Sequence, residues 1–243
     1  MKKTRIDKLL LERGLADSRE KARALIMAGA VLVEEQPILK AGASVAAGAS
    51  VRLRRKAHPY VGRGGVKLAG ALDEFGVDPA GGAAADIGAS TGGFTDCLLR
   101  AGARRVWAID VDTDQLDWRL RADPRVRTVR GNARYLERDW LEDAVDLVTM
   151  DVSFISVRKI LPVVPRILGP GGQVLVLVKP QFEVGRGQVG RGGIVRDPDL
   201  HARAVDDVVA DAASSGLGLR GTCPSPIRGK QGNQEFWVWF QRV

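Results

Sequence analysis

The sequence predicts an α/β protein in which a small N-terminal α+β domain precedes a Rossmann-like, doubly wound parallel sheet. From about residue 62, short apolar runs alternate with helix-like segments. These runs are continuous, which is typical of strands buried on both faces. Charge divides the chain at the same place: residues 1–60 contain 13 Lys/Arg against 6 Asp/Glu, whereas the remainder contains 24 against 23. The expected organisation is a domain over 1–55, a linker over 56–61 and a larger domain over 62–243.

The first 55 residues predict two short helices and a small sheet. Apolar residues recur at helical spacing up to Gly14, and Ser18 is placed to cap a second helix that Gly29 ends. The expected elements are helices over 5–13 and 19–28, a hairpin of 31–33 and 37–39, and a strand over 50–53. A unit of this size has little apolar core of its own.

The larger domain predicts strands that alternate with helices. The final strand places Phe236, Val238 and Phe240 on one face and Trp237 and Trp239 on the other. The expected strands are 83–87, 106–109, 145–150, 174–178 and 235–242, and the expected helices are 65–75, 91–101, 115–121, 156–168 and 199–215.

Composition excludes several classes of protein. With 45% hydrophobic residues the chain is not globally disordered, and two cysteines are too few for a disulfide framework. Two histidines and two cysteines do not make a structural zinc site, so we expect no metal. The longest apolar runs are too short to span a bilayer, and the first residues lack a signal peptide's apolar stretch. We therefore expect a cytoplasmic protein that does not bind membranes.

The basic excess of the N-terminal domain indicates a polyanionic partner, with nucleic acid the leading candidate. The alternative is a basic surface that serves solubility alone. Four basic side chains fall mostly off the apolar helix faces and can point outward together: Arg5, Lys8, Arg19 and Arg23.

A glycine-rich turn follows the first strand of the larger domain. It reads D-x-G-x-x-x-G-G from Asp86 to Gly93, which is neither G-x-G-x-x-G nor a phosphate-binding P-loop. An aspartate at its start would repel a pyrophosphate but suits a cationic or hydroxyl-rich ligand. Asp110 ends the next strand, where an acid can accept hydrogen bonds from ribose hydroxyls. The pattern fits S-adenosylmethionine, and the alternative is a tight turn that serves packing alone.

Charged residues at strand ends suggest chemistry at the same edge of the sheet. Asp151 and Lys179 each follow an apolar strand, and ligands of open α/β sheets bind outside those ends. A lysine, with an ordinary pKa of ~10.4, becomes a base when desolvation or a neighbouring cation lowers that pKa. We expect Lys179 to take the proton of a ribose 2′-hydroxyl. Asp151 would orient that lysine and also face the sulfonium. The alternative is an ordinary ion pair.

Two further charged residues complete the candidate catalytic set. Lys67 follows Arg63-Gly64-Gly65, and Glu235 begins the last strand. Lys67 would lower the pKa of Lys179 and stabilise developing negative charge, and Glu235 would orient Lys67 or the target ribose. Taken singly, each is more readily a surface charge or a member of an ordinary ion pair.

Other methyl-transfer chemistries fit these residues less well. Methylation of an exocyclic base nitrogen usually uses an Asn/Asp-Pro-Pro-aromatic turn, and the corresponding turn here is Asp151-Val152-Ser153-Phe154. Methylation of a pyrimidine carbon needs a cysteine nucleophile. Cys97 lies within a predicted helix as a core residue, and Cys223 lies in a proline-rich segment far from every strand end.

Five motifs in order resemble the TlyA (hemolysin A) family, ribosomal RNA cytidine 2′-O-methyltransferases with an FtsJ-like catalytic domain. They are Arg63–Leu68, Asp86–Thr95, Asp151–Ser156, Leu177–Glu183 and Gly232–Glu235. The first 55 residues are similar to the RNA-binding domain of a small-subunit ribosomal protein, the S-four type. In this domain type the hairpin turn often reads Asn-Gly, where this chain has Glu34-Glu35.

The resemblance implies a Lys-Asp-Lys-Glu tetrad at Lys67, Asp151, Lys179 and Glu235, and ribosomal RNA within ribosomal subunits as the partner. Arg63 joins the expected RNA contacts. The expected contacts to S-adenosylmethionine are Asp86, Gly88, Ala89, Ser90, Thr91, Gly92, Gly93, Phe94, Asp110 and, around the adenine, Asn132 and Ala133. Two alternative functions remain at this point: a membrane-active haemolysin, as the older family name suggests, and a non-catalytic RNA-binding factor that has kept the fold.

Overall fold

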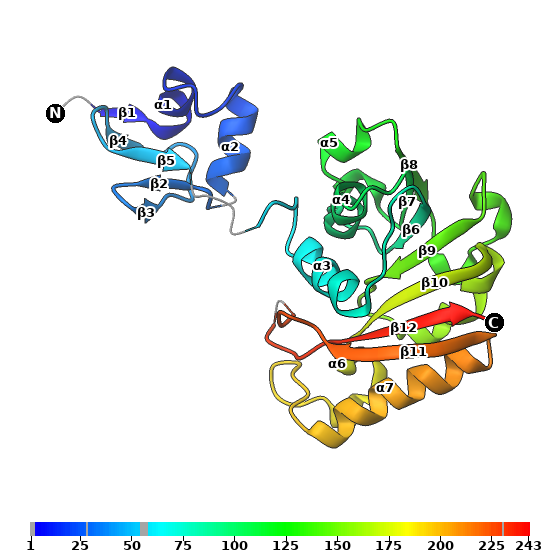
Figure 1. Ribbon diagram of the computed structural model, residues 1–243. Coiled ribbons are helices and arrows are strands. Elements are labelled where there is room, and N and C mark those ends of the chain that lie inside the picture. The colour runs from blue at the N-terminus through cyan, green and yellow to red at the C-terminus, as the bar shows by residue number, and fades with distance from the viewer. Residues whose placement is uncertain (1–2, 28, 54–57, 230) are drawn as a thin grey trace. The chain divides into compact units, whose positions relative to one another are not determined.

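The computed structural model describes residues 3–27, 29–53, 58–229 and 231–243 (Figure 1). The chain forms two compact units, Met1–Pro59 and Tyr60–Val243. Residues 56 and 57 of the predicted linker lie outside the described residues. So do residues 1, 2, 28, 54 and 55 of the predicted N-terminal domain, of which residue 28 ends the predicted helix 19–28.

The first unit contains the two predicted helices and the predicted hairpin. Its elements are α1 (Ile6–Glu12), α2 (Arg19–Met27), β1 (Lys3–Arg5), β2 (Val31–Val33), β3 (Gln36–Pro37), β4 (Ser44–Ala46) and β5 (Val51–Leu53). Strand β2 lies between β3 and β5, and β1 pairs with β4, a pairing that sequence patterning did not predict. The Ser18 hydroxyl accepts the Lys21 amide at 3.1 Å, which confirms the predicted cap. Ile6, Leu10 and Ile26 are fully buried at the centre.

The hairpin between β2 and β3 turns on two glutamates in a left-handed conformation. Glu34 has φ 48° and Glu35 has φ 63°, as a two-residue type I′ turn requires. The Glu34 carboxylate accepts the Ser50 amide at 2.7 Å, and Glu35 pairs with Arg52 at 2.6 Å. Both acids therefore bind within the small unit, Glu34 to the residue before β5 and Glu35 to Arg52 in β5.

The second unit is built on one seven-stranded sheet. Its strands are β6 (Ala83–Ile87), β7 (Arg105–Asp110), β8 (Val126–Arg130), β9 (Val145–Met150), β10 (Leu168–Val178), β11 (Leu217–Pro224) and β12 (Phe236–Arg242). They lie in the order β11-β12-β10-β9-β6-β7-β8. The five strands from β8 to β10 are parallel, and β12 is antiparallel to both of its neighbours. The sheet is thus mixed, where we expected a parallel one, because β12 inserts between β10 and β11.

Helices cover both faces of this sheet. The helices are α3 (Gly64–Phe75), α4 (Gly93–Arg100), α5 (Trp118–Arg121), α6 (Pro180–Glu183) and α7 (Pro198–Ala213). One apolar core contains α3, α4 and Trp237, and the other contains α7 together with Val238 and Phe240. The two faces predicted for the last strand are therefore confirmed.

Two predicted helices are wrong. The segment 115–121 contains a single helical turn, α5, at its end. The segment 156–168 forms two short 3-10 helices, Val157–Lys159 and Leu161–Arg166, and Leu168 already belongs to β10. Pro162 and Pro165 account for the second difference, because each lacks the amide hydrogen that an α-helix needs and its ring disfavours the helical conformation of the preceding residue.

Asp86, in β6 just before the glycine turn, is fully buried beneath that turn. Its carboxylate accepts the hydroxyl of Thr95 at 2.7 Å and that of Thr149 at 3.4 Å. Burial is the main cause that raises the pKa of Asp86 from 3.8 to about 7, against the opposing effect of the Thr95 hydroxyl.

This carboxyl gives the stability of the second unit a defined pH dependence. Between about pH 4 and pH 7 the folded state binds a proton that the unfolded state has released, so the free energy of unfolding falls as pH rises. Asp86→Asn keeps an acceptor for Thr95 and removes the charge. We expect this variant to be more stable than the wild type at pH 8, by up to about 4 kcal/mol, and to have no such advantage near pH 4. Thermal unfolding followed between pH 4 and pH 8 tests this, and an equal effect at every pH would contradict it.

Candidate functional site

The carboxyl ends of β9 and β10 bring Asp151 and Lys179 together. The Lys179 Nζ lies 2.5 Å from Asp151 Oδ1, and it donates to the Ser153 hydroxyl at 2.9 Å. Lys179 is buried, with 7% of its surface exposed. An amine taken out of water needs such partners, because desolvation otherwise costs several kcal/mol. Ser153 is a member of this group that sequence reasoning missed, although it lies in the same strand-end motif.

Lys67 and Glu235 form a second buried pair. The Lys67 Nζ lies 2.6 Å from Glu235 Oε2, and both residues are more than nine-tenths buried. Lys67 comes from the second turn of α3, and Glu235 directly precedes β12. The chain closes tightly around this carboxylate, since a Cβ on Gly229 would lie 2.5 Å from Glu235 Oε1. The four predicted catalytic side chains therefore form two ion pairs, Asp151 with Lys179 and Lys67 with Glu235.

A small cavity of about 200 Å³ connects Lys179 with the glycine turn and with the start of α3. Its lining includes Asp151, Ser153 and Lys179, and also Arg63, Gly64, Gly88, Ala89, Ser90, Thr91, Gly93 and Phe94. Lys67 stands one helical turn beyond Gly64 on α3 but does not line this cavity.

A larger cavity of about 420 Å³ adjoins the small one, and the two share Gly88, Ser90, Asp151 and Ser153. Of the predicted cofactor residues, Gly88, Ser90, Asp110, Asn132 and Ala133 line it. Its volume is in the range of small-molecule sites. The described residues of its lining include two aspartates, Asp110 and Asp151, and neither lysine nor arginine. Such a cavity suits a ligand that carries positive charge and hydroxyls and disfavours one that carries phosphate.

Two polar residues of the larger cavity also hold its walls in place. The Asp110 carboxylate accepts the amides of Ser90 at 2.8 Å and Asp112 at 3.0 Å, which ties the glycine turn to the end of β7. The Asn132 side chain accepts the amide of Arg134 at 3.1 Å. Apolar side chains from several elements complete the walls, among them Ile109, Val111 and Ile160.

Two predicted cofactor residues, Asp86 and Gly92, line neither cavity. Successive strand residues point to opposite faces, and the Asp86 side chain points into the core. Gly92 has φ 92°, and a Cβ there would lie 2.2 Å from a methyl group of Leu120. Both residues thus serve the packing of the turn, which the sequence left open as an alternative.

Gly88 shows how closely the turn approaches the end of β9. Its φ is 83°, and a Cβ at this position would lie 2.5 Å from the backbone oxygen of Asp151. Only glycine permits this approach without displacing the strand end.

Phe154 is an unexpected residue of the site. Its side chain lies at the rim of the larger cavity, 92% of its surface is exposed, and its φ is 65°. The Phe182 ring lies 5.5 Å away. A large exposed aromatic residue held in a left-handed conformation is rare and is typical of binding sites. The sequence feature that could have indicated Phe154 is its position in the segment that follows β9.

The predicted RNA-contacting residues differ in their surroundings. Arg63 lines the small cavity and donates to the backbone oxygen of Arg228 at 3.0 Å. Arg19 and Arg23 are exposed on α2. Arg5 pairs with Asp7 at 2.9 Å and Lys8 with Glu12 at 3.7 Å. The hydrogen bond from Arg5 lowers the pKa of Asp7.

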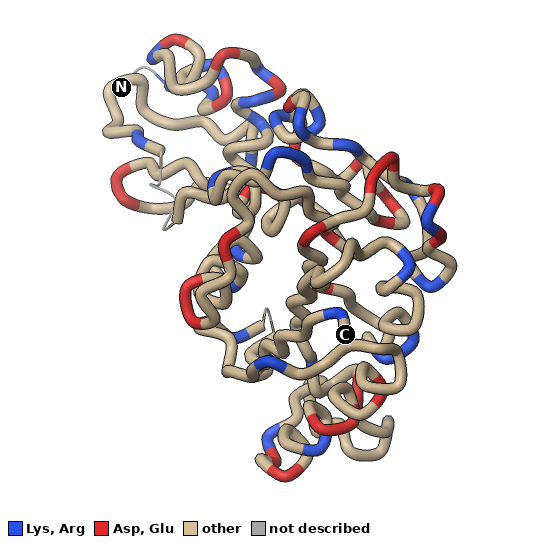
Figure 2. The backbone as a smooth tube through the Cα atoms, turned by 45° about the vertical axis from the view of Figure 1, so that its right-hand side comes forward, with Lys and Arg blue, Asp and Glu red and all other residues tan. Residues whose placement is uncertain are grey.

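Charge on the second unit is balanced locally. Lys and Arg are interspersed with Asp and Glu along this backbone (Figure 2). The described part of the chain contains no cluster of three or more His, Cys, Asp or Glu side chains that could hold a metal ion. Among the same residues, no helix has the length and apolar character needed to cross a bilayer. Burial raises the pKa of the Cys97 thiol to about 12, in keeping with a core residue.

Comparison with known proteins gives two family matches. Residues 60–242 match the FtsJ-like methyltransferase family, and residues 4–51 match the S4 domain. A putative rRNA methyltransferase, YqxC of Bacillus subtilis, is 46% identical over 97% of this chain and 84% of its own length. The 16S/23S rRNA (cytidine-2'-O)-methyltransferase TlyA of Mycobacterium tuberculosis is 43% identical over 99% of this chain and 90% of its own length.

A solved structure agrees over the whole chain. The putative hemolysin of Streptococcus thermophilus is 43% identical, covers 100% of this chain and 90% of its own, and superposes with a TM-score of 0.77. The motifs, the sheet order and these matches agree: the chain belongs to the TlyA family and combines an S4 domain with an FtsJ-like methyltransferase domain.

Proposed function

We propose that this protein transfers a methyl group from S-adenosylmethionine to the ribose 2′-hydroxyl of a cytidine in ribosomal RNA. The observation that carries the proposal is the buried Lys179 amine, held by Asp151 and Ser153 where the acidic cavity meets the small one. The choice of cytidine as the target nucleotide comes from the name of the relative TlyA. Family membership favours this activity over a membrane-active haemolysin or a non-catalytic RNA-binding factor.

The larger cavity would hold the cofactor. Asp110 would accept hydrogen bonds from the ribose hydroxyls, and Asn132 with Ala133 would enclose the adenine. Asp151 would face the cationic end of the ligand. When bound, S-adenosylmethionine supplies a methyl group activated by a sulfonium.

The chain's own side chains would activate the acceptor. The Lys179 amine would take the proton of the 2′-hydroxyl while the methyl group passes to that oxygen. Asp151 would orient the Lys179 amine and then neutralise the ammonium. Lys67 would stabilise negative charge on the oxygen, and Glu235 would orient Lys67 through the 2.6 Å ion pair between them.

RNA would bind at three places. Phe154 offers an exposed ring at the cavity rim, on which the base of the target nucleotide would stack. The N-terminal domain, taken as 1–55 and joined by the linker 56–61 to the domain 62–243, would bind phosphates through Arg19 and Arg23. Arg63 would bind a phosphate beside the small cavity.

The primary experiment is labelled-methyl transfer to isolated ribosomal subunits, followed by nucleoside mapping. We expect labelled 2′-O-methylcytidine. Label in a methylated base, or no label in either subunit, would contradict the proposal.

Substitution of Lys179 distinguishes a role as general base from a role that needs only its positive charge. We expect Lys179→Ala and Lys179→Arg both to reduce kcat by at least about 10²-fold, because arginine keeps the charge but does not release its proton. Cofactor binding, measured by calorimetry, should persist in both. An active Lys179→Arg variant would remove the role as base and leave an electrostatic one.

Substitution of Phe154 tests the stacking surface. Phe154→Ala should weaken RNA binding by about 1–3 kcal/mol, whereas Phe154→Tyr should retain it. Because this ring is exposed, the thermal stability of both variants should match that of the wild type. Unchanged RNA affinity of Phe154→Ala in filter binding would count against this stacking role.

Exposed arginines of α2 provide a test for the N-terminal domain. The double variant Arg19→Ala/Arg23→Ala should bind RNA more weakly, because fewer phosphates are neutralised. The slope of log K against log salt should become shallower by about one for each phosphate that the variant no longer binds. Arg203→Ala, an exposed arginine on α7, is the matched control. Equal slopes for the two variants would reject the proposed binding of phosphate by α2.

A further inference from the structure

Two chain segments at the catalytic edge lie side by side. Residues 151–157 follow β9, and residues 179–183 follow β10 and form α6. Interactions join them at three successive levels. Lys179 binds Asp151 and Ser153, the Phe182 ring packs against Phe154, and Glu183 binds the far end of the first segment.

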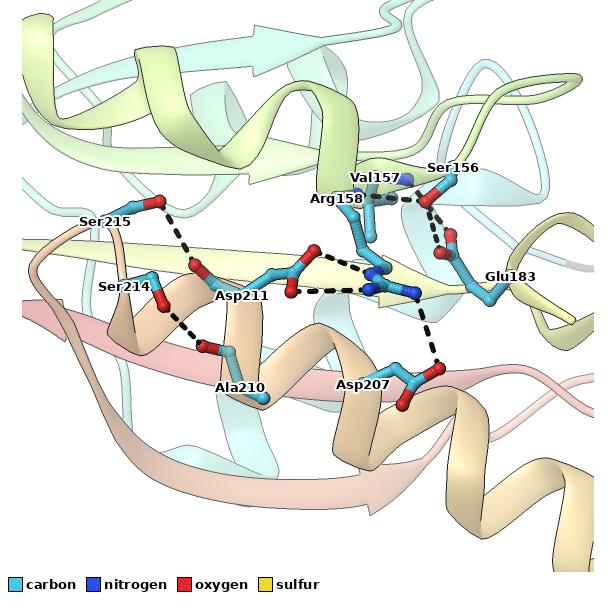
Figure 3. A network of polar contacts seen from close by, with 9 residues as sticks. All are labelled: Ser156, Val157, Arg158, Glu183, Asp207, Ala210, Asp211, Ser214 and Ser215. Atoms are coloured by element: carbon cyan, nitrogen blue, oxygen red, sulfur yellow. Dashed lines mark hydrogen bonds and ion pairs between the residues drawn. The ribbon is translucent and has the colours of Figure 1, made fainter.

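Glu183 makes two hydrogen bonds to that far end (Figure 3). Its carboxylate accepts the Ser156 hydroxyl at 2.5 Å and the Val157 amide at 3.0 Å. Ser156 in turn accepts the Arg158 amide at 3.2 Å and so caps the short helix that begins at Val157. One largely buried carboxylate thereby fixes both the side chain and the backbone at which the segment ends.

Arg158 ties the same end to a second helix. Its guanidinium donates to Asp211 at 2.7 and 3.3 Å and to Asp207 at 3.3 Å, both on α7 (Figure 3). The segment is thus anchored at one end by Lys179 and at the other by Glu183 and Arg158. Ser153 and Phe154 lie between the anchors, and Phe154 has φ 65°, a conformation that a free loop would leave.

We propose that Glu183 is a positioning residue for methyl transfer, which holds Ser153 and Phe154 in place on the acceptor side of Lys179. The inference rests on the proposed function. Glu183 lines neither cavity, so it acts through the segment that it holds. Its place four residues after Lys179, on the short helix α6, links the end of β10 that carries Lys179 to the 151–157 segment.

Removal of this anchor should lower the rate and spare cofactor binding. A displacement of about 1 Å at reacting groups costs about 10²-fold in rate. We therefore expect Glu183→Ala to reduce kcat by about 10²-fold, while the Kd for S-adenosylmethionine stays within twofold. Glu183→Gln should recover most of the rate, because its amide oxygen can accept the Val157 amide while its nitrogen donates to Ser156.

A matched control and a double-mutant cycle make the test specific. Glu137→Ala removes an exposed carboxylate that pairs with Arg166 in the same unit, and it should leave kcat unchanged. Ser156→Ala should lower kcat by itself, and Glu183→Ala should then cost less in the Ser156→Ala background than in the wild type. Additive effects on kcat would mean that Glu183 does not act through Ser156.

The outcomes separate this inference from the proposed function. If the wild type methylates ribosomal RNA and Glu183→Ala keeps kcat within threefold, the positioning role is overturned and the proposed function stands. If Glu183→Ala abolishes cofactor binding along with activity, or Glu183→Gln fails to recover the rate, the role is structural and the inference is overturned. If the wild type methylates no RNA, the proposed function itself fails.

Discussion

The site depends on the register between β9 and β10. These parallel strands pair Met150 with Val176, so that Asp151 and Lys179 leave the sheet at neighbouring points although they are far apart in sequence. An amine and a carboxylate that meet at 2.5 Å in a mostly buried place are costly to desolvate and repay this only with good geometry. The hydroxyl of Ser153 and the packing around both strand ends supply that geometry. The register between the apolar strands β9 and β10 therefore determines that Asp151 and Lys179 lie side by side.

The second constraint is the charge of the larger cavity. Nucleotide sites that hold phosphate use backbone amides together with lysine or arginine. Here a glycine turn of similar placement faces Asp110 and Asp151, and the described residues of the lining include no basic side chain. Arg63 and Lys179 line the small cavity instead. Within the second unit, the same turn therefore borders an acidic cavity and a small cavity that contains basic groups.

Sequence patterning predicted the strands that are continuous apolar runs, and with them the residues at their ends. It missed β8 and β11, because one alternates arginine with valine and the other is interrupted by glycine, so neither resembles a buried strand. It placed a helix over 156–168 despite Pro162 and Pro165. It assigned Asp86 to the ligand because a motif does not reveal which face of a strand a side chain takes. The sequence left open whether Glu235 orients Lys67 or the target ribose, and tertiary packing places it against Lys67. The exposure of Phe154 also follows from tertiary packing, which no local pattern encodes.

The position of β12 within the sheet has a consequence for biosynthesis. This strand follows the other six strands of its sheet in the sequence, yet it lies between β10 and β11, with Trp237 in one core and Phe240 in the other. Until it emerges from the ribosome, β10 has an unpaired edge, and until Glu235 emerges just before it, Lys67 lacks that carboxylate partner. A nascent chain therefore passes through a stage in which an apolar strand edge is open to aggregation. Premature termination upstream of Glu235 would leave a product with that edge open and without the carboxylate that binds Lys67.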